Sequence, residues 1–207
     1  MAQVIYLVDD DASVRESLTF LFSTLNWPVQ GYASVDAFSA ACPPDGLQTG
    51  CLLLDMRMPG KSGLAWLEER HGGWPLLPTI IMTGHGSIDA CRRAFLHGVF
   101  EFFTKPLDAD RLIDTVQSAF DESAARAAVW QERKRVQQLF DLLTPRETEV
   151  LHALMTGASN KEVAQRLSLS ARTVEAHRAA IFNKLGVGSL VQAIREHDKL
   201  SLVKLPG

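Results

Sequence analysis

Four short, largely apolar runs in the first half of the chain each end within two residues of a polar side chain. The runs cover residues 4–8, 51–54, 78–82 and 100–103, and the polar residues at their ends include Asp9, Asp55, Thr83 and Lys105. Residues 4–8 and 51–54 are apolar throughout, which is typical of parallel strands that are buried on both faces of a sheet. The sequence therefore predicts a parallel sheet with polar residues at the carboxyl ends of its strands.

Segments with apolar residues at helical spacing separate these runs. They cover residues 13–25, 64–69, 89–96 and 110–120, and Gly98 follows the third segment as a helix-ending residue. Residues 29–32 form a weaker fifth strand. Strands that alternate with helices imply βαβ units. The expected fold is a doubly wound α/β domain with a five-stranded parallel sheet, covering residues 1–121.

Polar side chains at different strand ends predict a site that handles phosphate. The carboxyl ends of parallel strands gather at one crevice, so Asp9, Asp10 and Asp55 should converge. Clustered carboxylates repel one another, and Mg²⁺ or another divalent cation relieves that repulsion. Lys105 supplies a cation for a phosphoryl oxygen, and Thr83 offers a hydroxyl from the same edge. Together they favour an acyl phosphate site in which Asp55 is the nucleophile, while the metal and Lys105 neutralise charge.

Four segments resemble the signature segments of receiver domains, which have a flavodoxin-like fold and belong to response regulators of two-component systems. The segments are Leu7-Val8-Asp9-Asp10-Asp11, Leu54-Asp55-Met56-Arg57-Met58-Pro59-Gly60, Met82-Thr83-Gly84-His85-Gly86 and Phe102-Phe103-Thr104-Lys105-Pro106. The resemblance implies that a sensor histidine kinase phosphorylates Asp55. It also implies that Asp10, Asp55 and the backbone carbonyl of Arg57 hold Mg²⁺, with Asp9 assisting.

The same resemblance implies a conformational switch. Thr83 is expected to move toward the phosphoryl group, and the aromatic ring of Phe102 to rotate inward. Lys105 contacts a phosphoryl oxygen, and the peptide bond before Pro106 is expected to be cis. The change should reach a surface formed by residues 89–96 and 100–103.

Three other positions in this half have more than one interpretation. Asp11 fits a helix N-cap better than a metal ligand. His85 is either a pH-sensitive group or an ordinary loop residue. Val99 stands where receiver domains commonly carry a small Ala, which affects packing near the signalling surface.

The charge changes sign along the chain. Up to Asp121 there are 15 acidic and 8 basic residues, and beyond it there are 9 acidic and 13 basic residues. A basic second half suggests a nucleic-acid partner. Residues 122–142 are rich in Ala and charged residues and contain no Gly or Pro. They predict a linker helix, which is either a solvated spacer or a helix that dimerises or docks.

Residues 143–207 show only helical patterns and predict an all-α, four-helix domain with a helix-turn-helix. Thr144-Pro145-Arg146-Glu147 fits a capping box with Pro at the first helical position. Two helices at residues 160–167 and 171–185 are joined by a short turn, and Ser170 caps the second. A longer second helix suits docking in the major groove of DNA.

The second of these helices has two different faces. Val174, His177, Ile181 and Leu185 lie on one side, where His177 is interpreted as a packing residue. Small and polar residues that could approach base edges lie opposite or beside them: Arg172, Thr173, Glu175, Ala176, Ala179, Ala180 and Asn183. Basic residues are candidates for phosphate contacts: Lys161, Arg166, Arg172, Arg178 and Lys184.

This half resembles the LuxR-type DNA-binding domain, and its combination with a receiver is most similar to the FixJ-like subgroup. The segments that carry the resemblance are Leu143-Thr144-Pro145-Arg146-Glu147, Gly157-Ala158-Ser159-Asn160-Lys161-Glu162-Val163-Ala164 and Arg172-Thr173-Val174-Glu175-Ala176-His177-Arg178. The resemblance implies a homodimer on phosphorylation, with a dimer contact through a helix at residues 189–197. It also implies binding to double-stranded DNA, RNA polymerase as a partner, and regulation of transcription, with activation expected.

Two other functions share parts of this pattern. Phosphatases of the aspartyl-phosphate class carry a second Asp two residues after the nucleophile, where this chain has Arg57. We therefore expect no enzyme activity beyond autophosphorylation from a phosphodonor and slow self-dephosphorylation. A phosphorylation sensor whose second half docks onto protein is the other alternative, and the positive charge there argues against it.

The remaining features favour a cytoplasmic protein. Cys42, Cys51 and Cys91 have no metal-type spacing, which is typical of small apolar residues in a reducing cytosol. No apolar run approaches the ~18 residues of a membrane span. The N-terminal sequence lacks the pattern of a secretory signal.

Overall fold

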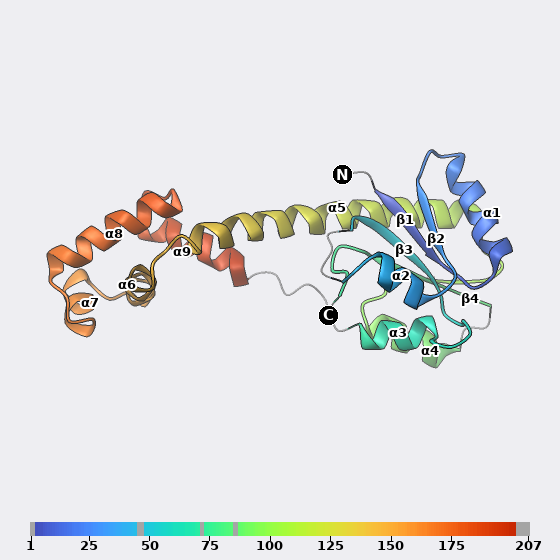
Figure 1. The fold of residues 1–207 in the computed structure, drawn as a ribbon, viewed down its shortest axis with the longest axis horizontal. Helices are drawn as coiled ribbons and strands as arrows, with labels where there is room; N and C mark the ends of the chain where they lie inside the picture. The colour runs from blue at the N-terminus through green and yellow to red at the C-terminus, as the bar shows by residue number, and fades with distance from the viewer. Residues whose placement is uncertain (1–2, 45–47, 71–72, 85–86, 202–207) are drawn as a thin grey trace. The chain divides into compact units, whose positions relative to one another are not determined.

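The computed structural model describes residues 3–44, 48–70, 73–84 and 87–201. The chain divides into two compact units, with the boundary between Ala128 and Val129 (Figure 1). None of the helices in these described ranges combines the length and apolar character that crossing a membrane requires.

The first unit contains the predicted five-stranded parallel sheet, in the order β2-β1-β3-β4-β5. The strands are β1 (Val4–Val8), β2 (Val29–Tyr32), β3 (Gly50–Asp55), β4 (Thr79–Thr83) and β5 (Glu101–Thr104). Every pairing between neighbours is parallel. Because the strand order reverses at β1, the crevice expected for a ligand lies beside the carboxyl ends of β1 and β3.

Helices cover both faces of this sheet (Figure 1). They are α1 (Ala12–Ser23), α2 (Val35–Ala41), α3 (Gly63–Glu69), α4 (Ile88–Leu96) and the first part of α5 (Ala109–Phe140). Leu52 and Leu54 of β3 pack in one core with Phe38 and Trp66, while Leu53 packs in the other core with Phe22. This alternation explains why β3 is apolar along its whole length.

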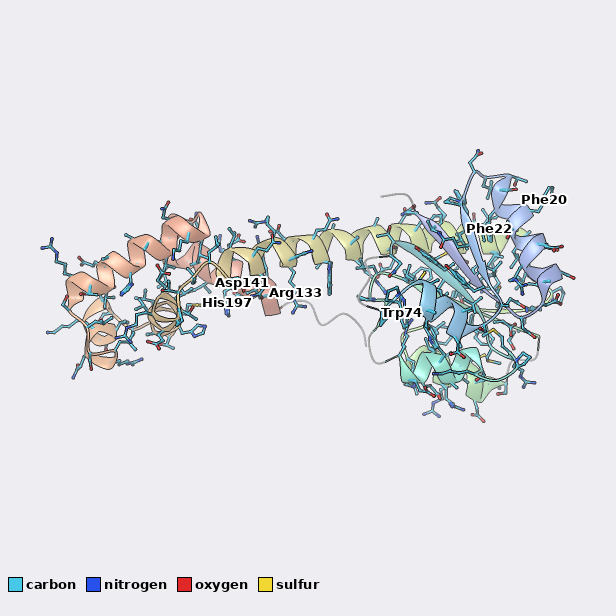
Figure 2. All side chains as sticks on the ribbon, viewed as in Figure 1. Phe20, Phe22, Trp74, Arg133, Asp141 and His197 are labelled. Atoms are coloured by element: carbon cyan, nitrogen blue, oxygen red, sulfur yellow. The ribbon has the colours of Figure 1, made fainter. Side chains whose placement is uncertain are left out.

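Helix α1 shows how one helix divides its residues between core and surface. Phe22 is fully buried, whereas Phe20 is 73% exposed. Figure 2 shows the two rings on different sides of the helix. The apolar stripe that predicted the helix is therefore the face that packs on the sheet.

Helix α2 was not predicted from the sequence. Ser34 caps it by accepting a hydrogen bond from the Ala37 N–H, and Val35 and Phe38 are buried. Seven residues with two buried side chains are too short a segment to display a helical period clearly.

Helix α5 differs from the prediction of two separate helices at residues 110–120 and 122–142. It is one continuous helix of 32 residues. No Gly or Pro interrupts residues 109–140, so nothing in the sequence ends the helix near Asp121. Leu112 and Val116 pack in the core of the first unit, and Leu139 and Phe140 pack in that of the second.

Ser123 shows that α5 stays with the first unit beyond the predicted boundary at residue 121. Its side chain is fully buried. The hydroxyl donates to the carbonyl oxygen of Leu76 at 2.7 Å and accepts from the Gly50 N–H at 2.9 Å. The first compact unit therefore extends past Asp121 to Ala128, into the residues predicted as the linker helix.

The second unit has the predicted helical architecture. After the end of α5 come α6 (Pro145–Met155), α7 (Asn160–Arg166), α8 (Ala171–Leu185) and α9 (Leu190–Ser201). Thr144 and Glu147 form the predicted capping box, and Ser170 caps α8. The helix expected at residues 189–197 is α9, which extends further, to Ser201. Val150, Leu154, Val163, Val174 and Ile181 are among the buried side chains of its core.

Candidate functional sites

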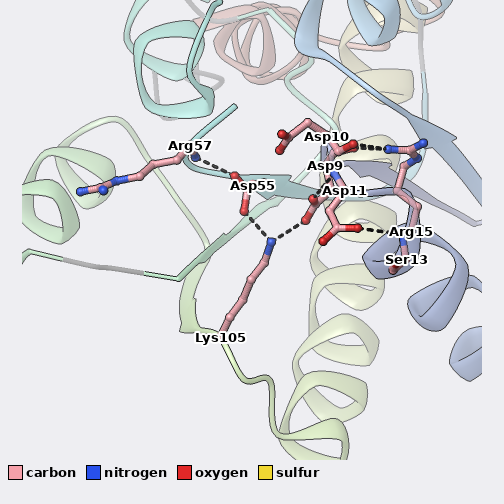
Figure 3. Close-up of polar contacts among 8 residues, drawn as sticks. All are labelled: Asp9, Asp10, Asp11, Ser13, Arg15, Asp55, Arg57 and Lys105. Atoms are coloured by element: carbon pink, nitrogen blue, oxygen red, sulfur yellow. Dashed lines mark hydrogen bonds and ion pairs between the residues drawn. The ribbon is translucent and has the colours of Figure 1, made fainter. Parts of the chain in front are cut away.

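The carboxyl ends of β1, β3 and β5 bring Asp9, Asp55 and Lys105 together (Figure 3). Asp9 is 1% exposed and Asp55 is 4% exposed. Lys105 Nζ donates to Asp9 Oδ2 and to Asp55 Oδ1, each at 2.7 Å. Two buried carboxylates thus share one ammonium group, which offsets their mutual repulsion.

Asp10 lies in the same loop but in a different environment. It is exposed, and its carboxylate forms no hydrogen bond or ion pair with any described residue. Figure 3 shows this carboxylate extending from the loop, away from the guanidinium of Arg15. Asp10 can therefore offer its oxygens to a ligand that enters from solvent.

Arg57 contacts the phosphoacceptor candidate through its backbone. Its N–H donates to Asp55 Oδ2 at 2.7 Å, while its side chain is exposed. Asp55 therefore accepts one hydrogen bond on each oxygen, from Arg57 and from Lys105, and this fixes the plane of its carboxylate.

Burial and pairing act in opposite directions on these groups. Burial raises the pKa of Asp55, and the hydrogen bond and charge of Lys105 offset this only in part. Burial alone would lower the pKa of Lys105, but its bonds to Asp55 and Asp9 outweigh burial and raise that pKa. At neutral pH the site therefore retains a protonated Lys105.

Thr83 and Phe102 lie on neighbouring strands beside this site. Thr83 is fully buried at the end of β4, and its carbonyl oxygen accepts from the Lys105 N–H at 2.7 Å. Phe102 is half-buried on β5, opposite Ile81. Its ring packs against the core that includes Ala94 of α4 and the buried Val99.

Two other expectations for this unit are confirmed. Asp11 caps α1, because its Oδ1 accepts from the Ser13 N–H at 2.8 Å. The Lys105–Pro106 peptide bond is cis. His85, which has two interpretations from the sequence, lies outside the described residues.

The donor atoms of this pocket are suited to a hard cation. The described ranges contain no group of three or more His, Cys, Asp or Glu side chains arranged as metal ligands. Mg²⁺, however, keeps several waters and is typically bound by one or two carboxylates together with phosphate. Asp10 and Asp55, with the backbone carbonyl of Arg57, are compatible with that chemistry.

The predicted base-reading residues mostly lie on the exposed face of α8. Arg172, Glu175, Ala176, Ala179 and Asn183 are exposed, and Thr173, Arg178 and Ala180 are half-buried. On the other face Val174, Ile181 and Leu185 are buried, and His177 is half-buried. Lys161 and Arg166 of α7 are exposed.

Lys184, a predicted phosphate contact, makes contacts inside the domain. Its Nζ pairs with Glu147 Oε2 at 2.6 Å and donates to the carbonyl oxygen of Leu142 at 3.2 Å. The structure therefore gives Lys184 a role inside the domain, where it joins the last turn of α8 to the first turn of α6.

Two arginines that the sequence analysis did not assign make contacts near the candidate sites. Arg15 Nη1 donates to the backbone oxygens of Asp9 and Asp10. The guanidinium of Arg146 donates to the carbonyl oxygen of Leu167, at the turn between α7 and α8. Both arginines donate to main-chain carbonyl oxygens. Every residue has such an oxygen, so the residue types in the sequence do not predict these contacts.

Two family comparisons match the two units separately. Residues 5–117 match the family "Response regulator receiver domain". Residues 141–197 match the family "Bacterial regulatory proteins, luxR family". The first match alone covers more than half of the chain.

Characterised relatives are similar over nearly the whole length. The transcriptional regulatory protein FixJ of Bradyrhizobium diazoefficiens is 35% identical over 191 residues, which is 92% of this chain and 92% of that protein. The C4-dicarboxylate transport transcriptional regulatory protein DctR of Rhodobacter capsulatus is 33% identical, covering 94% of this chain and 99% of that protein.

Two solved structures are similar to this chain over nearly its whole length. The structure of the response regulator StyR is 34% identical, with a TM-score of 0.79, and the similarity covers 96% of this chain and 100% of that one. Full-length FixJ from B. japonicum is 33% identical, with a TM-score of 0.57 and coverage of 98% of each chain.

Proposed function

Because the chain belongs to the response regulators that join a receiver domain to a LuxR-family DNA-binding domain, we propose that phosphorylation of Asp55 controls its binding to DNA. Proteins of this family regulate transcription and are not classical enzymes. The observation that carries the proposal is the buried Asp55 carboxylate, which lies 2.7 Å from Lys105 Nζ in the receiver unit.

The proposed phosphodonor is the phosphohistidine of a sensor histidine kinase. An oxygen of Asp55 forms a bond to phosphorus as the P–N bond of the phosphohistidine breaks, and the departing nitrogen keeps the electron pair. Lys105 is already beside Asp55, so its ammonium can pair with an oxygen of the transferred group. Asp10, Asp55 and the carbonyl of Arg57 would hold Mg²⁺, with Asp9 assisting, and the metal would neutralise charge on the phosphoryl oxygens.

The surface that responds to phosphorylation is proposed to be α4 and β5. Ile88, Phe95 and Leu96 on α4 are 87%, 51% and 71% exposed. Exposed apolar side chains that cluster on one element are typical of an interaction site. We infer that Thr83 and Phe102 transmit the change to this surface, and that the phosphorylated protein forms a homodimer there.

A two-fold dimer would present two copies of α8 to paired half-sites on double-stranded DNA. The exposed residues Arg172, Glu175, Ala176, Ala179 and Asn183 are proposed to face base edges, with Thr173 beside them. Lys161, Arg166 and Arg178 are the proposed phosphate contacts. Promoter-bound dimers would then contact RNA polymerase, and activation is the expected outcome.

The test uses the full chain with Mg²⁺ and acetyl phosphate. Intact mass spectrometry should show the gain of one phosphoryl group in the wild type and no gain in Asp55→Asn. The control is Asp114→Asn, which changes an exposed Asp of α5 and should gain one phosphoryl group like the wild type. Fragmented genomic DNA retained by the protein should be enriched at a few loci only with the phosphodonor. Phosphorylation of Asp55→Asn would overturn the assignment of the phosphoacceptor. Equal enrichment without the phosphodonor would overturn control by phosphorylation.

A further inference from the structure

The side chain of Arg15 holds the backbone of the loop that carries the acidic residues. A single nitrogen, Nη1, donates to the carbonyl oxygen of Asp9 at 2.7 Å and to that of Asp10 at 3.0 Å. We propose that Arg15 is a positioning residue for the divalent cation site, acting through these two carbonyls. This inference rests on the proposed function, because it concerns the metal that the receiver site would hold.

The first argument comes from the position of Arg15 in α1. It lies in the first turn of a helix whose first turn contains no acidic residue. The partial positive charge of a helix N-terminus disfavours a cation there. The helix dipole therefore does not explain an arginine at this place, and the contacts that hold its guanidinium are the two hydrogen bonds to the loop.

The second argument is that Asp10 depends on this contact more than its neighbours do. The Asp9 N–H donates to the Tyr32 carbonyl at 3.1 Å, and Asp9 Oδ1 accepts from the Asp11 N–H at 3.0 Å. Asp11 is fixed as the cap of α1. The Asp10 carboxylate has no partner among the described residues, so the bond from Arg15 to its carbonyl restrains where that carboxylate can lie.

The third argument is that Arg15 restrains the loop without neutralising it. Within the described ranges, no ion pair joins Arg15 to a carboxylate, whereas Lys105 pairs with both Asp9 and Asp55. In Figure 3 the guanidinium lies on one side of the loop and the Asp10 carboxylate extends to the other. The arginine therefore orders a loop of mutually repelling carboxylates and leaves the oxygens of Asp10 available to a cation.

Two physical effects of Arg15 on metal affinity have opposite signs, which makes the proposal testable. As a nearby positive charge, Arg15 repels Mg²⁺, so removing it would tighten binding. As a clamp on the loop, it keeps Asp10 in place, so removing it would weaken binding. Partners of metal ligands typically change metal affinity by about tenfold or more when they are lost.

The experiment is a Mg²⁺ titration of the ¹⁵N-labelled full chain, followed through the amide signals of residues 9–13 and 57. The variants are Arg15→Met, which keeps an apolar stem, and Arg15→Lys, which keeps the charge but has a shorter reach. Arg92→Met makes the same change at an exposed position of α4 and serves as the control. Unchanged signals from the strand residues establish that each variant remains folded.

We expect Mg²⁺ to bind Arg15→Met about tenfold more weakly than the wild type, Arg15→Lys to lie between them, and Arg92→Met to equal the wild type. Equal or tighter binding by Arg15→Met would overturn the positioning role while leaving the metal site intact. Absence of any Mg²⁺-dependent shift in the wild type would instead overturn the metal site of the proposed function, and the role of Arg15 with it. If Arg15→Met fails to fold, the Mg²⁺ affinity of Arg15→Lys decides. Weaker binding than the wild type supports the positioning role, and equal binding overturns it.

Discussion

Lys184 Nζ lies 2.6 Å from Oε2 of Glu147, and the side chain of Glu147 is only 8% exposed. The same oxygen accepts a hydrogen bond from the Thr144 N–H at 2.7 Å, which closes the capping box of α6. One carboxylate therefore connects the start of α6 to the last turn of α8. The ion pair therefore joins a half-buried lysine near the end of α8 to a buried carboxylate of α6.

The first prediction concerns the loss of this carboxylate. Glu147→Ala should lower the free energy of unfolding of the second unit by about 1–3 kcal/mol, because it removes a buried acceptor and leaves Lys184 without its partner. Glu147→Gln keeps an acceptor for the Thr144 N–H and should lower it less. Amide hydrogen exchange in α6 and α8 of the full chain measures the effect in this unit. Equal protection in Glu147→Ala and the wild type would contradict the role given to the pair.

The second prediction is a dependence on pH that has a definite sign. The hydrogen bond from Lys184, with those from Thr144, lowers the pKa of Glu147 from its ordinary 4.5 to about 2. A carboxyl whose pKa is depressed by folding stabilises the folded state fully above its unfolded pKa. That stability should be lost as the pH falls from about 5 to about 2. The protection factors of the α6 amides, which are corrected for the intrinsic pH dependence of exchange, should fall over this range in the wild type and less so in Glu147→Gln.

The third prediction concerns the shared ammonium group of the receiver site. Lys105→Met should lower the free energy of unfolding by about 1–3 kcal/mol at neutral pH, because two buried carboxylates lose their common partner. Added Mg²⁺ should restore more stability to this variant than to the wild type. Lys61→Met, which breaks an ion pair to the exposed Glu69, should change stability by less than about 1 kcal/mol. Denaturant unfolding, monitored by fluorescence, measures the free energy of unfolding of each variant. Equal losses of stability in Lys105→Met and Lys61→Met would contradict the prediction.

The fourth prediction uses a glycine that approaches the backbone of the phosphoacceptor. A Cβ atom at Gly63 would lie 2.1 Å from the carbonyl oxygen of Asp55, so Gly63→Ala must displace that backbone. Phosphorylation by acetyl phosphate should slow at least several-fold in this variant. Gly31→Ala is the control, because the nearest atom to its added Cβ would be Arg15 Cδ at 3.7 Å, an ordinary contact. Phosphorylation of Gly63→Ala at the wild-type rate would contradict the prediction, because the site would then tolerate the displaced Asp55 backbone.

The fifth prediction separates phosphate contacts from internal ones. Lys161→Ala should weaken binding to all DNA sequences alike and reduce the slope of log affinity against log salt by about 1. Glu175→Gln should instead alter the base preference, by about 1–3 kcal/mol at one position. Lys184→Ala should leave the salt slope unchanged, because its charge is paired with Glu147. Filter binding between 50 and 200 mM salt measures the slopes.

The sheet and the centre of its site were predictable because the local pattern is unambiguous. An apolar run buried on both faces that ends in Asp9 or Asp55 places that side chain at the carboxyl edge, whatever packs around it. The caps at Asp11, Thr144 and Ser170 were predictable for a similar reason, since each depends on residues within one turn.

The features that were missed depend on contacts between distant parts of the chain. Lys184 has the residue type and position of a phosphate contact, and its ion pair with a residue 37 positions earlier has no local signal in the sequence. Arg15 looks like an ordinary solvated helix residue, because its partners are carbonyls that any sequence would supply. The continuity of α5 was missed because a change of composition at Asp121 was interpreted as a change of structure.

The hydrogen bonds of Ser123 have a consequence for domain exchange between related regulators. A chimera that takes a new output domain directly after residue 121 would replace the hydroxyl that bonds Gly50 and Leu76. Downstream, the fully buried Val136 lies in the second unit, and Leu139 packs against the core of that unit. A recombination junction that preserves both cores must therefore fall within α5 itself, in the short stretch around Ala128 and Val129, where the helix contributes exposed residues.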